Sequence, residues 1–428
     1  MNNYLKTFLR GSAISIAGAV LLGFTNYWVR RVLCYNMSLE DYGAFFSTFA
    51  LFFVIFGFTD LGLTQSGTVM IATSAENKSE RDVFFSHLFF IKSAVALLGA
   101  AGIAAFYWLN RGGNDIFFLL IFLAYFVMQV FNGTLQALWG GLKKYTLQQA
   151  GYCVIALATV FFVCCLPQCD LKSVALCFLA AATTGFLFGL IYSRGAKLGE
   201  LKFCLDKNKV KVLLSTGGII AITTTLFTLM HNVSVIMLNW QKGAASAGLY
   251  NIALPIMQIV QGVMVFPGVF LPIAVDMSRH HEYTKLRVFV RAALFTALVA
   301  LIPTGIFFYY SSPLLIRVLF KPEYVGAASA TTLLCLGLVF FTLGNFLFQI
   351  MLSLNKSVIM TVITVITTVF CLVLNYILID LAGIGGAATA TLISYALFAV
   401  MTYVALEFYI KRMKREYENK KNHGLAEK

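Results

Sequence analysis

Most ionisable side chains of this chain lie in short connectors, but a few interrupt long apolar stretches, where a charge is costly unless it has a partner or a function. Arg30 and Arg31 lie near the end of one stretch, and Asn26 shares a helix face with Arg30. Lys92 lies roughly 12–15 Å into another stretch. Because arginine holds phosphate through paired N–H groups, Arg30 and Arg31, with Asn26 beside them, are candidates for binding an anionic head group, and Lys92 is a candidate for contacting a substrate. The alternative is that the three cations extend to water past a helix end.

Four further polar residues are candidates for ion coupling or for lining a polar cavity. Histidine as a residue type titrates near neutral pH, so His231 is a candidate for coupling proton movement to another process; the alternative is that it is a packing residue. Asp60 ends an apolar stretch, where hydration or helix capping is the alternative role. Asn132 and Gln258 either bind sugar hydroxyls or tie neighbouring helices together.

The elements that carry these residues are long apolar stretches. The chain is 60% hydrophobic and 12% charged, with a mean hydropathy of +0.83, whereas a soluble domain is about 25% charged. About 20 apolar residues in a helix cross the roughly 30 Å of hydrocarbon in a bilayer. The sequence therefore predicts an all-α polytopic membrane protein whose twelve helices form two six-helix bundles around a central cavity. The predicted spans are 11–33, 41–62, 83–108, 116–139, 146–166, 173–193, 212–238, 247–275, 288–310, 325–352, 357–379 and 385–408.

Basic residues indicate the orientation of these spans, because cytoplasmic connectors are enriched in Lys and Arg. If the N-terminus is cytoplasmic, 24 of the 32 basic residues lie in cytoplasmic connectors and 7 lie outside, with Lys92 within a span. Both termini are therefore predicted to be cytoplasmic. The net charge of +14 is then mainly a topology signal, and its spread over many connectors argues against a nucleic-acid partner.

The longest internal connector divides the chain near its middle. We expect an N-terminal bundle over 1–193, a cytoplasmic linker over 194–211, a C-terminal bundle over 212–410 and a basic cytoplasmic tail over 411–428. A weak repeat supports this division, since Gly43 and Gly248 each accompany an aromatic residue at the start of a helix. Two bundles of the same orientation, facing each other across a cavity, are typical of an alternating-access carrier.

Enzymatic chemistry finds little support in the chain. The connectors are too short for a soluble catalytic domain, and no GxxxxGK[ST] motif for ATP is present. The nine cysteines include no CxxC pair, so we interpret the group of Cys164, Cys165 and Cys169 as packing residues rather than as a metal or disulfide site. No catalytic residue, metal or cofactor is expected.

Three segments together resemble polysaccharide-biosynthesis flippases of the Wzx type, in the multidrug/oligosaccharidyl-lipid/polysaccharide (MOP) superfamily. The first runs from Arg30-Arg31 through Ser38-Leu39-Glu40-Asp41-Tyr42-Gly43. The second is Asp60-Leu61-Gly62-Leu63, and the third is the Gly- and Ala-rich stretch over 381–391. The likeness extends over the whole chain in length, helix count and helix order.

This resemblance implies translocation of an undecaprenyl-diphosphate-linked oligosaccharide from the cytoplasmic to the outer leaflet of a bacterial inner membrane, for O-antigen, lipopolysaccharide, capsule or exopolysaccharide synthesis. It also implies that cavity cations, here Arg30, Arg31 and Lys92, receive the diphosphate, and that a glycan polymerase and other assembly proteins are partners. A multidrug or cation antiporter of the same superfamily and a membrane glycan polymerase are the alternatives. Sugar identity, coupling ion and oligomeric state stay open.

Overall fold

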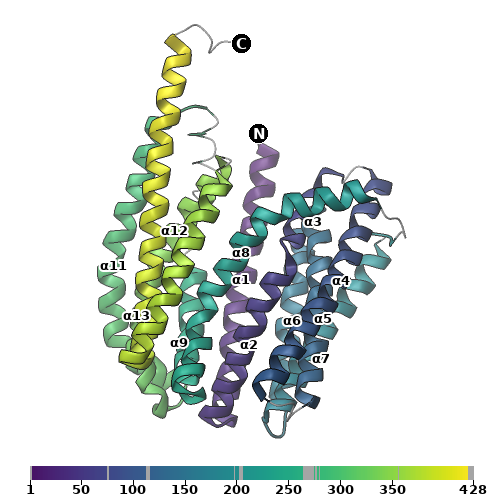
Figure 1. Ribbon diagram of the computed structural model, residues 1–428, viewed down its shortest axis with the longest axis vertical. Helices are drawn as coiled ribbons and strands as arrows, with labels where there is room; N and C mark the ends of the chain where they lie inside the picture. Colours follow the sequence, from purple (N-terminus) through teal and green to yellow (C-terminus); the bar gives the residue numbers. More distant parts are fainter. Residues whose placement is uncertain are drawn as a thin grey trace. The chain divides into compact units, whose positions relative to one another are not determined.

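The computed structural model describes residues 2–74, 77–111, 116–196, 198–201, 206–263, 274, 277–278, 280–354 and 356–422 (Figure 1). These residues form helices and connectors, with no strand among them. The all-α prediction is therefore confirmed. Contacts divide the chain into two compact units, unit 1 over Met1–Gly248 and unit 2 over Leu249–Lys428.

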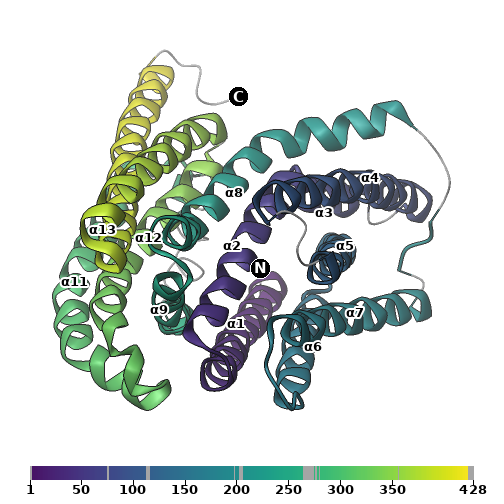
Figure 2. The ribbon, with the colours of Figure 1, turned by 60° about the horizontal axis from the view of Figure 1, so that its bottom comes forward.

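Unit 1 is a helical bundle built around α5. This helix contacts α2, α3, α4, α6 and α7, and Figure 2 shows it enclosed by them. Helix α8 packs along α2, α3 and α4. The helices of unit 1 are α1 (Asn2–Asn36), α2 (Leu39–Asp60), α3 (Leu63–Thr73), α4 (Lys78–Arg111), α5 (Ile116–Gly141), α6 (Tyr145–Cys164), α7 (Leu171–Gly195), α8 (Lys207–Lys242) and the first residues of α9 (Ala244–Val263).

The junction between α2 and α3 is a sharp break in the backbone. Leu61 and Gly62 both adopt left-handed conformations, with φ of 48° and 64°. Such angles end a helix, and a non-glycine residue adopts them only at some cost. The predicted span over 41–62 therefore ends where α2 ends, but the sequence did not predict the short helix α3.

Unit 2 is arranged around α12. Helix α12 (Ala328–Ser353) packs between α11 (Tyr283–Leu319) and α13 (Ser357–Asn422), and the short 3-10 helix η1 (Pro322–Ala327) joins α11 to α12. Within α13, Gly383 leaves the helical region with φ 55° and ψ −124°. This kink separates the predicted spans over 357–379 and 385–408.

The apolar helices make this chain a multi-pass membrane protein. Nine helical stretches among the described residues are long and apolar enough to cross a membrane, and one of them, Ser357–Asn419, holds two predicted spans. Each predicted span begins on a helix of the structure. The span over 247–275 continues past α9 into residues 264–273, which lie outside the described part of the chain. The count of twelve stays a prediction.

The predicted linker over 194–211 does not coincide with the boundary between the two units. Contacts assign α8 to unit 1, because this helix packs on α2, α3 and α4. The division into six and six helices therefore stays a prediction. The described part of the predicted tail over 411–428 continues α13 as a helix to Asn422.

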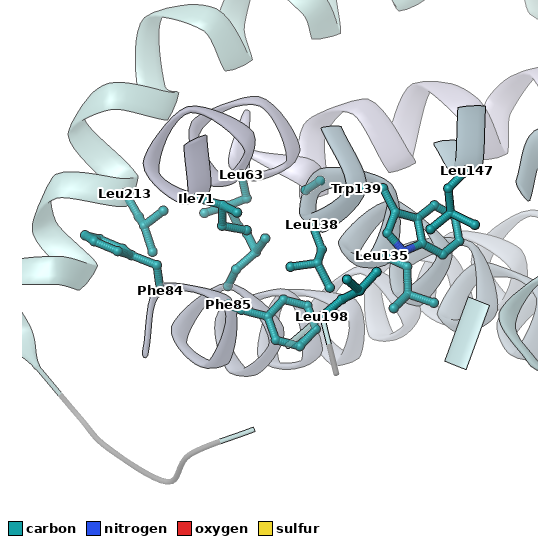
Figure 3. Packing of buried hydrophobic residues seen from close by; sticks show 12 residues of the cluster. Leu63, Ile71, Phe84, Phe85, Leu135, Leu138, Trp139, Leu147, Leu198 and Leu213 are labelled. Carbon is teal, nitrogen blue, oxygen red and sulfur yellow. The ribbon is translucent and has the colours of Figure 1, made fainter. Parts of the chain in front are cut away.

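A buried apolar cluster fixes the end of unit 1 where α3, α4 and α5 meet (Figure 3). Trp139, which lies beside Leu135 and Leu147 in Figure 3, is 1% exposed and donates a hydrogen bond from Nε1 to Ser193 Oγ of α7 at 3.0 Å. This bond satisfies the indole N–H inside an apolar environment. The cluster comprises Leu63, Ile71, Phe84, Phe85, Leu88, Leu135, Ala137, Leu138, Trp139, Leu147, Leu198 and Leu213.

Candidate functional site

Lys92, Asp60 and Thr64 form a polar group inside the helical bundle of unit 1. The Lys92 ammonium lies 2.8 Å from Asp60 Oδ1 and donates a hydrogen bond of 2.6 Å to Thr64 Oγ1. Thr64 in turn donates from Oγ1 to Asp60 Oδ1 at 2.6 Å. These contacts join α4 to the junction of α2 and α3. We refer to the three residues as the Lys92 triad.

The local backbone explains why Asp60 lies at this position. Asp60 is the last residue of α2, and its Oδ2 accepts a hydrogen bond from the backbone N–H of Thr64, in the first turn of α3. A carboxylate at a helix start satisfies a backbone N–H that has no partner within the helix and interacts favourably with the helix dipole. The same side chain therefore caps α3 and faces Lys92.

A glycine of α5 leaves space for the ammonium. A Cβ atom added at Gly133 would lie 3.1 Å from Lys92 Nζ and 3.6 Å from Thr64 Oγ1. Any larger residue at this position would compete with the ammonium for the same volume. Helix α8 supports the α2 end of the group, since Thr225 Oγ1 donates to the carbonyl oxygen of Gly57 at 2.7 Å.

Burial makes the charges of the triad interdependent. The side chain of Lys92 is 2% exposed and that of Asp60 is 17% exposed. Because both charges are largely withdrawn from water, removing one partner leaves the other uncompensated, at a cost of about 3–5 kcal/mol for a buried pair. The triad is close to neutral as a whole, so Lys92 does not present an unopposed positive charge.

Arg30 and Asn26 are brought together as predicted. Arg30 is 9% exposed, and its Nε donates to Asn26 Oδ1 at 3.3 Å. Its guanidinium also lies 4.1 Å from the ring centroid of Phe46 on α2. Both of these neighbours are neutral, and an aromatic face attracts a guanidinium. Arg31 instead donates to the hydroxyl of Tyr27 at 2.8 Å.

The remaining candidates lie on α5, α8 and α9. Asn132 donates from Nδ2 to the carbonyl oxygen of Ala182 at 2.9 Å, which ties α5 to α7. His231 lies half-buried on α8. Gln258 belongs to α9, but its side chain lies outside the described residues.

Sequence reasoning missed two members of the site. Thr64 lies four residues after Asp60, a spacing that brings side chains together within a helix but that here crosses a helix break. Gly133 contributes only space, so its role depends on Lys92 being next to it. In the sequence, the contact between Asp60 and Thr64 is indicated only by an Asp-x-x-x-Thr pattern at a predicted helix end.

A separate cavity of about 360 Å³ lies between two connectors of unit 1. It contains none of the predicted site residues. Asp170 caps the start of α7 at this place, and a hydrogen bond from Ser173 lowers the pKa of its carboxyl group. The cavity is lined by Asn36, Met37, Ser38, Asp41, Leu166, Pro167, Gln168, Cys169 and Asp170.

Among the described residues, no group of three or more His, Cys, Asp or Glu side chains is arranged to hold a metal ion.

Solved structures with the same fold are MOP-superfamily transporters. An inward-facing multidrug resistance transporter of the MATE family superposes with a TM-score of 0.76 at 14% identity, over 92% of this chain and 96% of that one. A MOP transporter from Pyrococcus furiosus, whose description reports a binding pocket of reversed polarity, gives a TM-score of 0.69 at 14% identity, over 96% of each chain. The fold is therefore that of MOP transporters.

Sequence comparison extends the likeness to relatives and to a family. An uncharacterised membrane protein of Methanocaldococcus jannaschii is 23% identical over 98% of this chain and 87% of its own length. The sequence model of the family described as polysaccharide biosynthesis protein matches residues 8–278, which is more than half of the chain. This chain belongs to the polysaccharide biosynthesis protein family.

Proposed function

We propose that this protein is a flippase that moves an undecaprenyl-diphosphate-linked oligosaccharide from the cytoplasmic to the outer leaflet of a bacterial inner membrane, by alternating access. The observation that carries this proposal is the family match over residues 8–278, a region that contains both Arg30 and the Lys92 triad. The product would supply O-antigen, capsule or exopolysaccharide assembly. Both termini would be cytoplasmic, and a glycan polymerase would consume the product outside.

Arg30 is the residue we assign to the diphosphate. Asn26 and Phe46 contact its guanidinium, and neither of these two neighbours carries a charge. A guanidinium fixed in this way binds phosphate oxygens in pairs. We do not assign Lys92 to the diphosphate in this conformation. Its ammonium is paired with Asp60 and must leave that carboxylate before it can bind phosphate. Arg31, His231, Asn132 and Gln258 have no assigned contact with substrate.

A multidrug or cation antiporter is the second candidate, since a structural neighbour is described as a multidrug resistance transporter. An organic cation requires an acidic side chain that is available to bind it. Asp60, the acid of the Lys92 triad, is already paired with an ammonium at 2.8 Å. This pairing favours the anionic substrate over the cationic one.

The test is leaflet transfer in vesicles that contain the purified protein. A labelled lipid-diphosphate oligosaccharide is placed on one leaflet, and its appearance on the other is measured with a membrane-impermeant quencher. Arg30→Ala should slow transfer at least about tenfold, because it removes a charge-assisted phosphate contact. Arg30→Lys should retain part of the rate, since lysine keeps the charge but loses the paired donors.

Arg412→Ala is the matched control, because it removes an exposed arginine that pairs with Glu416 beyond the apolar part of α13. It should transfer substrate at the unmodified rate. If the label changes leaflet equally fast without protein, the flippase proposal is wrong. A normal rate in Arg30→Ala would leave the function standing but remove Arg30 from the substrate site.

A further inference from the structure

Two arginines and one glutamate join α11 to α13 in unit 2. Arg287 Nε lies 2.5 Å and Arg291 Nη2 lies 2.7 Å from the same oxygen, Glu407 Oε1. Arg287 and Arg291 are one helical turn apart, so both guanidinium groups face α13 from one side of α11. The three side chains carry a net charge of about +1, because one carboxylate is shared between two cations that stay protonated.

The three residues differ in their access to the surroundings. Glu407 is 12% exposed and Arg287 is 33% exposed, whereas Arg291 is 53% exposed. Arg287 and Glu407 therefore form the inner contact between the two helices. Arg291 lies at its outer edge, where a ligand outside the protein can reach it.

The surface around Arg291 is apolar. On α11, Val288 is 63% exposed one turn before it and Phe295 is 69% exposed one turn after it. On α13, Val404 and Phe408 are each 59% exposed on either side of Glu407. In a multi-pass membrane protein such residues face lipid chains. Arg291 therefore lies on an exposed, largely apolar face formed by α11 and α13.

The cluster also lies at the end of the apolar region. Glu407 is followed one turn later by Lys411 and then by Arg412 and Lys414, and α11 begins close by at Tyr283. Arginine at this depth lies at the level of lipid head groups, where its side chain reaches phosphate while its stem contacts acyl chains.

We propose that the α11–α13 face binds the head group of an anionic phospholipid, with Arg291 and Arg287 holding its phosphate and with Val288, Phe295, Val404 and Phe408 contacting its chains. The net positive charge of the cluster selects an anionic over a zwitterionic lipid. The residues of this site belong to unit 2, whereas Arg30 and the Lys92 triad belong to unit 1, and the proposal does not depend on the proposed substrate.

Lipid binding is tested by native mass spectrometry of delipidated, purified protein titrated with phosphatidylglycerol or with phosphatidylcholine of the same chains. The first phosphatidylglycerol should bind about tenfold more tightly than phosphatidylcholine, as expected for an added charge-assisted contact. Arg291→Ala should abolish this preference. Glu407→Gln should strengthen phosphatidylglycerol binding, because it removes the carboxylate that competes with the phosphate for both guanidinium groups.

Arg412→Ala is again the matched control and should keep the preference, since Arg412 is 61% exposed and pairs with a glutamate outside the apolar face. Arg291→Ala must also retain the melting temperature of the delipidated protein, which shows that the fold is intact. Equal phosphatidylglycerol binding by Arg291→Ala and the unmodified protein would overturn the proposal. It would also be overturned if inorganic phosphate or the lipid-diphosphate displaced phosphatidylglycerol at equal concentration, because the site would then select a free anion or the substrate.

Discussion

Lys92 shows how one buried charge depends on its immediate neighbours. Its ammonium contacts the carboxylate of Asp60 and the hydroxyl of Thr64, and Gly133 leaves room for it. A lysine at this depth would be unfavourable alone, and the pair is tolerated because each charge compensates the other. The triad therefore ties α4 to the break between α2 and α3.

Removing one charge of the triad at a time should have unequal effects. Asp60→Asn leaves an ammonium that is 2% exposed without its counter-charge, and should lower stability by about 3–5 kcal/mol. Lys92→Met leaves the more accessible carboxylate and should cost less. The loss of stability in the double variant, which carries both Asp60→Asn and Lys92→Met, should be smaller than the sum of the losses in the two single variants. Thermal unfolding of each purified variant in detergent measures these differences.

The exposed pair between Lys78 and Glu200 is the control for this comparison. Its atoms are 2.6 Å apart, but both side chains are more than half exposed. Glu200→Gln should therefore change stability by no more than about 1 kcal/mol. Equal melting temperatures for Asp60→Asn and Glu200→Gln would contradict the assigned role of the buried pair.

At the scale of elements, two glycines allow a close approach of helix backbones within unit 1. A Cβ atom added at Gly43 of α2 would lie 1.8 Å from the carbonyl oxygen of Ala244 and 2.7 Å from the backbone nitrogen of Gly248. Small residues permit such contacts between membrane helices. Gly43 and Gly248 are also the residues that the sequence repeat pairs as equivalents, and the structure places them against each other.

Gly43→Ala should therefore destabilise the protein, because the new methyl group meets backbone atoms that cannot rotate away. The loss should exceed the gain of about 1 kcal/mol that alanine brings to a helix. Gly102→Ala on α4 is the control, since an added Cβ there meets nothing within 4 Å. We expect a lower melting temperature for the first variant and an equal or higher one for the second. The opposite order would show that the two backbones are not in close contact.

At the scale of the whole molecule, the basic residues of the connectors predict which ends of the helices face the cytoplasm. Exposed Cys164 ends α6, and exposed Cys165 begins a connector over 165–170 that has no basic residue, whereas the connector after α5 contains Lys143 and Lys144. These two connectors flank α6, which is a candidate membrane span. We therefore predict that they lie on opposite sides of the membrane.

Cysteine labelling of intact cells tests this orientation. A membrane-impermeant thiol reagent should modify Cys164 or Cys165 when it is added outside. Lys143→Cys, in a chain whose native cysteines are replaced, should react only after the membrane is permeabilised, because positively charged connectors stay in the cytoplasm. Labelling of Lys143→Cys from outside would invert the predicted topology.

The sequence by itself determined the fold class and the membrane environment, because helix formation and hydropathy are properties of consecutive residues. It also located Arg30 and Asn26 on one helix face, since their spacing is local. It did not predict α3, whose start depends on two left-handed residues and on capping by Asp60.

Tertiary structure decided which charges are paired. Lys92 was a candidate phosphate ligand in the sequence, but packing of α4 and α5 against the α2–α3 break places its ammonium on Asp60. The sequence gives no reason to link Arg287 and Arg291 to Glu407, which α13 brings between them in the folded chain. The physical reason is that a charge acts on whatever lies within a few ångströms of it. Those neighbours come from helices far apart in the chain, and only their packing determines which ones meet.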